Sequence, residues 1–282
     1  MRLAWRVLAF VVLGMAAVGV LTAAALSPIH PRADRVWAAD HAAMPTSRFD
    51  GHLVHVHQVR NFSHPAAGRF VAAYDDRTYD LDRLESVWFV LVPFGTTWRG
   101  PAHSFVSFGF RGDSTHKPDY VAISVEARRE PGEHYSALLG MLKRFELLYV
   151  VGDERDLIVQ RAMGGDDVYL YPVHTTPDKM RRMFVEMLER ANTLQRQPEF
   201  YNTLTNNCTS NLVDHVNAIT PHKVPQGIKT ILPGYSDEVA YAIGLIDTPL
   251  PLEEARRRFY ITKIARAAAD SPDFSTRIRA PK

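Results

Sequence analysis

Hydrophobic and polar positions divide this chain into an apolar N-terminal run and a longer region with alternating and then helical periodicity. Residues 7–26, VLAFVVLGMAAVGVLTAAAL, carry no charge. At about 1.5 Å of rise per residue, a helix of this length spans the hydrocarbon core of a bilayer. Arg2 and Arg6 precede the run, and positive charge stays in the cytoplasm, so everything after Leu26 should be exported.

A cleaved signal peptide is the alternative, because Thr22-Ala23-Ala24-Ala25 offers small residues to a peptidase. The apolar run is longer than the usual signal core of about 7–15 residues, which favours an uncleaved transmembrane helix. We divide the chain into an anchor or signal segment at 1–27, a linker rich in Pro, Ala and Asp at 28–50, a folded domain at 51–262 and a polar C-terminal tail at 263–282.

Short alternating or apolar runs in the folded domain predict β-strands. The expected strands are residues 52–60, 86–94, 102–110, 120–130, 145–151, 156–161 (DLIVQR) and 168–173. The segment RGDSTHKPD at 111–119 has turn chemistry, so the strands on either side of it should pair as a hairpin.

The pattern becomes helical at Pro177, a residue suited to the first turn of a helix. Apolar residues then recur at helical spacing opposite a charged side, at Met180, Met183, Phe184, Met187, Leu188, Ala191 and Leu194. We expect this helix to pack on the sheet. Further helices are expected at 135–144, from about Cys208 to Pro221, and at 236–246, so the fold class is α+β.

Composition narrows the function. The net charge is +2 and 23% of residues are charged, with no basic excess that would indicate a nucleic-acid partner. The 282 residues contain one cysteine, Cys208. Exported proteins usually pair their cysteines as disulfides, so a single thiol is either a small buried hydrophobe or a reactive group.

The residues around Cys208 favour a reactive group. Asn207 is a favoured N-cap, which places the thiol in the first turn of the next helix. There the helix dipole and unpaired N–H groups stabilise a thiolate, lowering its pKa from about 8.5, and can also hold an oxyanion. An inert thiol, an intermolecular disulfide and a metal ligand remain open alternatives.

A nucleophilic cysteine needs a base, usually histidine, and a polar group that orients it. Among 12 histidines, His103 stands at the start of a predicted strand among small residues. Glu126 and Ser124 lie on the expected partner strand. They are two residues apart, so their side chains point to the same face of the sheet. His215 is the competitor, but it lies two turns along the helix from Cys208 and points away from a thiol at the helix tip.

Three separated stretches resemble the Lnb N-terminal periplasmic domain family, a bacterial envelope domain named after a lipoprotein N-acyltransferase. They are PAHSFVSFGF (101–110), the run from YVAISVEARRE to DLIVQR (120–161), and PEFYNTLTNNCTSNL (198–212). The similarity extends from VRNF (59–62) and YDDRTYDL (74–81) to FSTRIR (274–279).

The resemblance implies a papain-like fold related to the permuted NlpC/P60 group, with an antiparallel sheet packed against helices and histidine before cysteine. It makes Cys208 the nucleophile, His103 the base and Glu126 the third member, unless Ser124 or a backbone group orients the imidazole. Asn207 and the Cys208 amide become oxyanion candidates.

The resemblance also implies that Arg128 could meet a phosphate or carboxylate of the substrate, with a structural ion pair as the alternative. No second apolar run of spanning length follows residue 27, so the membrane part of the named acyltransferase is missing. Lipoprotein N-acylation itself therefore stays open.

We expect a single-pass inner-membrane protein with its catalytic domain in the periplasm, or a free periplasmic protein if the leader is cleaved. Its function would be that of a cofactor-free thiol amidase, esterase or acyltransferase that acts on an envelope lipid, lipoprotein or peptide. The alternatives are a non-enzymatic lipid- or peptide-binding module and a metal site at His52, His55, His57 and His64. The histidines have no carboxylate nearby at ligand spacing, so we expect no metal.

Overall fold

The computed structural model describes residues 2–32, 34–95, 99–115, 117–221, 223–224 and 232–280. Within these residues eight strands form one sheet in the order β1-β2-β9-β8-β7-β6-β10, with β5 also paired to β2. The strands are β1 (Thr46–Asp50), β2 (Leu53–Arg60), β5 (Tyr74–Asp80), β6 (Leu84–Pro93), β7 (Ala102–Phe110), β8 (Asp119–Arg128), β9 (Glu146–Asp153) and β10 (Tyr169–Pro172). A separate pair consists of β3 (Ser63–Ala66) and β4 (Arg69–Val71).

The neighbouring strands of the main sheet pair antiparallel, except that β2 and β9 meet in parallel at Arg60 and Gly152. The predicted hairpin is confirmed, since β7 pairs with β8 from Phe110↔Asp119 to Phe105↔Ser124. Beyond that pair lie His103 on β7 and Glu126 on β8, at one end of the sheet.

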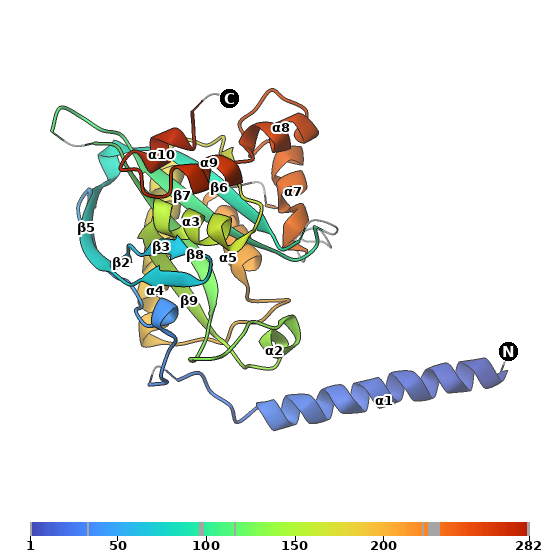
Figure 1. Ribbon diagram of the computed structural model, residues 1–282. Coiled ribbons are helices and arrows are strands. Elements are labelled where there is room, and N and C mark those ends of the chain that lie inside the picture. The colour runs from blue at the N-terminus through green and yellow to red at the C-terminus, as the bar shows by residue number, and fades with distance from the viewer. Residues whose placement is uncertain are drawn as a thin grey trace.

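Helices cover both faces of the sheet (Figure 1). The helices are α1 (Arg2–Leu26), α2 (Ala137–Met141), α3 (Glu154–Gly164), α4 (Pro177–Arg196), α5 (Cys208–Ile219), α7 (Ser236–Ala242), α8 (Leu252–Phe259), α9 (Thr262–Ala267) and α10 (Phe274–Arg277), with short 3-10 turns η1 (Ala39–His41), η2 (Leu81–Arg83) and η3 (Pro233–Tyr235). Helices α4 and α5 pack on one face, and α3, α9 and α10 build a second apolar layer on the other. The α+β prediction is confirmed.

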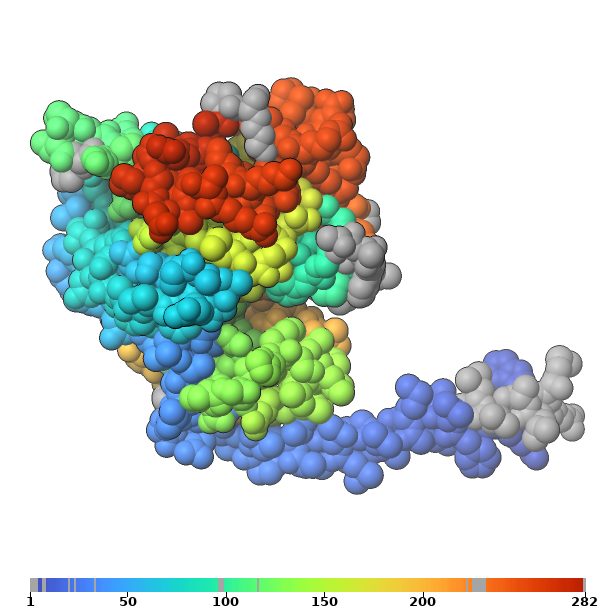
Figure 2. Space-filling view, in the orientation of Figure 1, coloured from blue at the N-terminus to red at the C-terminus, as the bar shows by residue number. Residues whose placement is uncertain are grey.

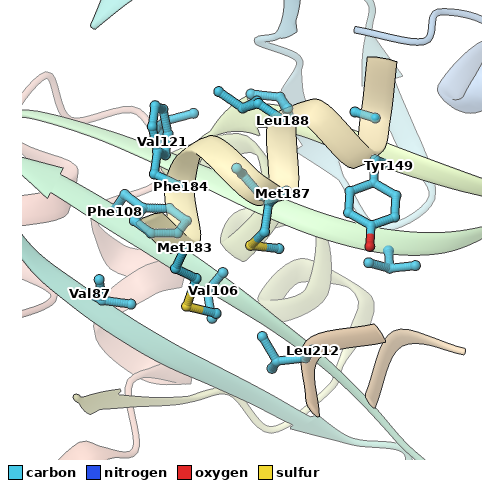
Figure 3. Packing of buried hydrophobic residues seen from close by; sticks show 14 of the residues in the cluster. Val87, Val106, Phe108, Val121, Tyr149, Met183, Phe184, Met187, Leu188 and Leu212 are labelled. Carbon is cyan, nitrogen blue, oxygen red and sulfur yellow. The ribbon is translucent and has the colours of Figure 1, made fainter. Parts of the chain in front are cut away.

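The long helix α4 packs as its periodicity predicts, because all seven residues of the apolar stripe are buried. Phe184 is fully buried and its ring meets those of Tyr79, Phe108 and Phe110 at centroid distances of 5.0–5.7 Å. Figure 3 shows it among Phe108, Val121 and Leu188 in this core. Burying a side chain of this kind contributes about 1.5–3 kcal/mol, so the apolar stripe stabilises the packing of α4 on the sheet.

The strand predicted at 156–161 is wrong, because those residues lie in α3. Asp153 caps this helix by accepting a hydrogen bond from the Arg155 amide, and Gly165 ends it at a φ of 100°. A short apolar run reads equally well as a strand or a buried helix, and only its caps distinguish the two. The caps were present in the sequence and outweigh the β-branched residues between them.

The segments expected as linker and tail both pack on the domain. Strand β1 belongs to residues 28–50 and pairs with β2, so the linker is partly structured. The expected polar tail contains α9 and α10, and Phe274 and Ile278 are buried in the second layer. In Figure 2 this C-terminal segment, coloured red, lies against the body of the domain. Its few apolar residues were too widely spaced to show a periodic pattern.

Helix α1 projects away from the folded domain (Figures 1 and 2). Of the described helices it alone is long and apolar enough to cross a membrane, over Ala9–Leu26. Large apolar side chains such as Phe10, Leu13 and Met15 are exposed along it. An exposed apolar helix of this length suits a membrane anchor.

Candidate active site

Cys208 is the first residue of α5, and its neighbours explain why the helix begins there. The Asn207 side chain accepts hydrogen bonds from the amides of Thr209 and Ser210, both at 2.9 Å. The Ser210 hydroxyl accepts in return from the Asn207 amide at 2.8 Å, completing a capping box. The thiol therefore sits at a helix N-terminus, and Cys208 is only 4% exposed.

His103 lies near the start of β7, where its imidazole is held on one side by two residues of β8. Its Nε2 atom is 2.7 Å from the Ser124 hydroxyl and 3.0 Å from Oε1 of Glu126. Ser124 in turn donates to Glu126 at 2.8 Å. The structure thus brings together both residues that shared a face in the sequence, and Nδ1 is the ring atom left for the thiol.

The His103 imidazole and the Cys208 thiol lie close enough together for each to shift the pKa of the other. Burial alone would lower the pKa of His103, but the Glu126 carboxylate and the nearby sulfur raise it to about 9. Burial alone would raise the pKa of the Cys208 thiol, yet the charge and hydrogen bond of His103, the Ser104 amide and the Thr209 hydroxyl lower it. These opposite shifts favour a thiolate paired with an imidazolium.

Arg161 of α3 places a positive charge beside Glu126. Its Nη2 atom lies 3.2 Å from Oε1 and 3.4 Å from Oε2 of the Glu126 carboxylate. Burial would raise the pKa of Glu126, but His103 and Arg161 hold it well below its usual range. Sequence reasoning missed Arg161, because it lies in the segment interpreted as a strand.

Two other predicted site residues have structural partners. Besides capping α5, Asn207 donates from Nδ2 to the Thr203 carbonyl at 2.7 Å. The Arg128 guanidinium donates to the carbonyls of His41 and Ala42 at 2.9 and 2.8 Å and lies 4.2 Å from the Trp37 ring centroid. Burial lowers the pKa of Arg128 to about 10. These contacts of Arg128 with residues 37–42 hold the linker against the domain.

The competing histidine has a different environment. His215 Nε2 lies 2.7 Å from the Tyr149 hydroxyl, which also donates to Asn211 at 3.1 Å. Burial lowers the pKa of His215 to about 4, so it stays neutral. This places it as a satisfied core histidine on the body of α5.

The four N-terminal histidines each have different partners. His55 contacts Thr78 at 2.9 Å, His57 contacts Asp76 at 3.0 Å and His64 contacts the buried Asp156 at 2.6 Å. His52 lies with Asp80 and Asp82, with ligand atoms within 4.8 Å of one another. Three of the four histidines thus lie beside carboxylates, which the sequence spacing did not indicate, and the four residues of the alternative metal site are divided among separate contacts.

An apolar cavity of about 100 Å³ lies between the sheet, α4 and α5; its lining includes chain neighbours of the Cys-His pair but neither His103 nor Cys208. The lining includes Ser104 and Thr209, which follow His103 and Cys208 in the chain. The hydroxyl groups of Ser104 and Thr209 are hydrogen-bonded to each other at 3.1 Å. The rest of the lining is mostly apolar and includes Val87, Phe89, Val106, Met183, Leu212 and Val216. Figure 3 shows Val87, Val106, Met183 and Leu212 grouped between the sheet and the two helices. Such a lining suits a hydrocarbon group.

Comparison with known proteins gives one match. The family model for the Lnb N-terminal periplasmic domain matches residues 70–234, more than half of the chain and the whole span from His103 to Cys208. No curated protein and no solved structure matches the chain.

Proposed function

The chain belongs to the Lnb N-terminal periplasmic domain family, and from this premise we propose that it is a membrane-anchored thiol acyl enzyme with a papain-like active site of the permuted NlpC/P60 type. The family and α1 together fit a single-pass inner-membrane protein with a periplasmic domain. One observation carries the proposal: the His103 imidazole contacts Glu126 through Nε2 and lies close enough to the helix-tip thiol of Cys208 for each to shift the pKa of the other.

In the proposed reaction the Cys208 thiolate attacks the carbonyl carbon of an ester or amide and forms a C–S bond. The carbonyl oxygen takes the electron pair, and the Cys208 amide at the N-terminus of α5 stabilises it. The His103 imidazolium gives its proton to the leaving alcohol or amine as that bond breaks, which leaves a thioester. Water or an amine then attacks the thioester, His103 accepts its proton, and the thiolate is released.

Glu126 and Ser124 position the imidazole in this scheme and do not touch the reacting atoms. The negative charge of Glu126 stabilises imidazolium, so the proton needed by the leaving group is present when the thiolate attacks. Arg161 keeps Glu126 ionised despite its burial.

The apolar cavity is lined by Ser104 and Thr209, one residue along the chain from His103 and Cys208, and its lining suits a hydrocarbon chain better than a polar cell-wall peptide. We therefore place envelope lipids and lipoproteins ahead of peptides as substrates. Hydrolysis and acyl transfer differ only in whether water or an amine resolves the thioester.

The first test is the rate of Cys208 alkylation against pH, measured on the full chain in detergent. Wild type should react as a thiolate with a pKa well below about 8.5, and His103→Ala should move that pKa upward. His174→Ala is the matched control, because its side chain is 75% exposed. A profile that does not respond to His103→Ala rules out the pair.

Turnover is the second readout. Nitrophenyl esters of increasing acyl length, incubated with the full chain, should give a thioester on Cys208 and a preference for longer chains. Cys208→Ser and His103→Ala should both lose turnover while remaining folded. Full activity in either variant contradicts the mechanism.

The apolar cavity also favours a second function, a module that binds a lipid without reacting with it. In that case a fluorescent fatty acid should bind wild type and Cys208→Ser equally, and no acyl ester should acylate Cys208. The same ester series therefore separates the two functions.

A further inference from the structure

Five large apolar side chains of the folded domain gather on two short segments near the anchor. They are exposed by 62% at Leu138, 53% at Leu204, 42% at Tyr135, 40% at Leu139 and 37% at Leu142. We infer that this apolar patch, defined by these five residues, inserts into the periplasmic leaflet of the membrane that holds α1. Clustered exposed apolar residues mark interaction surfaces, whereas single ones need no explanation.

The two segments of the patch form one unit. The Thr203 hydroxyl donates to the Ala137 carbonyl at 2.7 Å and lies 3.2 Å from the Tyr135 hydroxyl. A Cβ at Gly140 would come within 2.3 Å of the same Thr203 oxygen, so glycine permits this close approach. Leu204 is therefore held beside α2, and the patch has a defined shape.

Contacts with the anchor identify the bilayer as the occupant. Lys143, one residue beyond the patch, donates from Nζ to the carbonyl of Leu26 at 2.9 Å and of Ile29 at 3.3 Å. Leu26 is the last residue of α1. The Arg32 amide then donates to Glu146 at 2.7 Å, so the chain is bound to this region as soon as it leaves the helix.

Geometry then places the patch at the membrane surface. Since α1 ends at Leu26 where it leaves the hydrocarbon core, a lysine touching that carbonyl lies at the level of the lipid headgroups. Figures 1 and 2 show α2 and the green segment around it lying next to the domain end of α1. Leucine side chains suit the acyl boundary and a tyrosine suits the interface, which is the composition of an interfacial segment.

The patch is also continuous with the loop that leads into α5 and Cys208. The rings of Tyr135 and Tyr201 meet edge to face at 5.8 Å. Tyr201 also lies near Cys208: burial is the main reason that the pKa of Tyr201 is raised, and the charge of the Cys208 sulfur raises it further. The Thr203 carbonyl, next to Leu204, accepts from Asn207. Insertion of the patch would bring this loop to the bilayer, but the inference does not depend on any reaction at Cys208.

The test measures the depth of a fluorophore on the full chain reconstituted in vesicles of phosphatidylethanolamine and phosphatidylglycerol. In a Cys208→Ser background, Leu138→Cys provides a single labelling site. Lipids carrying a nitroxide quencher in the acyl chain should strongly quench this label. Thr78→Cys is the control, since it is exposed on β5, which lies beyond the domain end of α1 in Figure 1, and it should not be quenched.

Leu139→Glu with Leu204→Glu, added to the labelled chain, should abolish quenching while α1 keeps the protein in the vesicles. Both positions are exposed, so folding should persist. A label at 138 that lipid quenchers do not reach overturns the inference. If its emission instead changes only as the protein-to-lipid ratio rises, the patch contacts a second copy and the inference is equally overturned. Neither result bears on the alkylation test, so the two proposals fail separately.

Discussion

Oε1 of Glu126 lies 3.0 Å from Nε2 of His103, so this ring nitrogen is held by β8. Ser124 bridges the same two groups, at 2.7 Å from the imidazole and 2.8 Å from the carboxylate. The ring is thus held in one orientation by two neighbours on one strand. The charge state of the thiol depends on this arrangement, and the pKa predictions follow from it.

Glu126→Gln should weaken the ion pair without removing the hydrogen bond to the ring. Losing an opposite charge within hydrogen-bonding distance typically changes a pKa by about 1–3 units, so the pKa of His103 should fall and that of Cys208 should rise. The ultraviolet absorbance of the thiolate against pH measures the second change. Glu189→Gln, at an exposed position of α4, is the control. Identical titrations in both variants would show that Glu126 does not set the charge of the pair.

The pH dependence of acyl transfer should follow the same two groups. Reaction needs Cys208 ionised and His103 protonated, so kcat/KM should rise through the lowered pKa of Cys208 and fall as His103 loses its proton at about 9. The folded pKa of His103 is raised, so its contribution to stability is complete below the unfolded value of about 6.5 and is lost as pH rises through the folded value. Activity that keeps rising beyond this pH would assign the proton transfer to another group.

Asn207 should act as a helix cap. Asn207→Ala removes the acceptor for two amides and should cost about 0.5–2 kcal/mol of stability. Asn207→Ser keeps a favoured cap and loses only the bond to the Thr203 carbonyl, which should cost about 0.5–1.5 kcal/mol. Urea unfolding of the full chain in detergent measures both. Turnover decides the remaining question, because Asn207→Ser lacks the side-chain N–H. A stable Asn207→Ser protein with a large loss of kcat would make that N–H an oxyanion donor.

Asp156 should be a carboxylate on which folding depends strongly. It is fully buried and accepts from Arg60 at 2.9 and 3.1 Å, from the Phe62 amide at 2.9 Å and from His64 at 2.6 Å. Asp156→Ala leaves the buried guanidinium of Arg60 without its carboxylate partner. Breaking such a pair typically lowers the free energy of unfolding by about 3–5 kcal/mol.

The matched control is Asp50→Ala, whose pair with Arg48 at 3.5 Å is largely exposed. Exposed pairs contribute about 0–1 kcal/mol, so this variant should unfold close to wild type. Equal losses of stability in the two variants would contradict the assignment of Asp156 as a buried structural centre.

Local periodicity was enough to predict the elements that carry the site. The strands around His103 and Glu126 follow from alternation and a turn between them, and α4 follows from its apolar stripe. The start of α5 at Cys208 follows from Asn207, because a cap acts on residues beside it in the chain. These features depend on neighbours a few residues apart.

Tertiary structure decided which side chains meet. The contact between His103 and Cys208, the arginine behind Glu126 and the linker contacts of Arg128 join residues far apart in sequence. No periodic pattern encodes such pairs, since they depend on strand register and on the face that each helix covers. Arg161 shows this most clearly: its chemistry was visible in the sequence, but its place beside Glu126 arose only when α3 packed on the sheet.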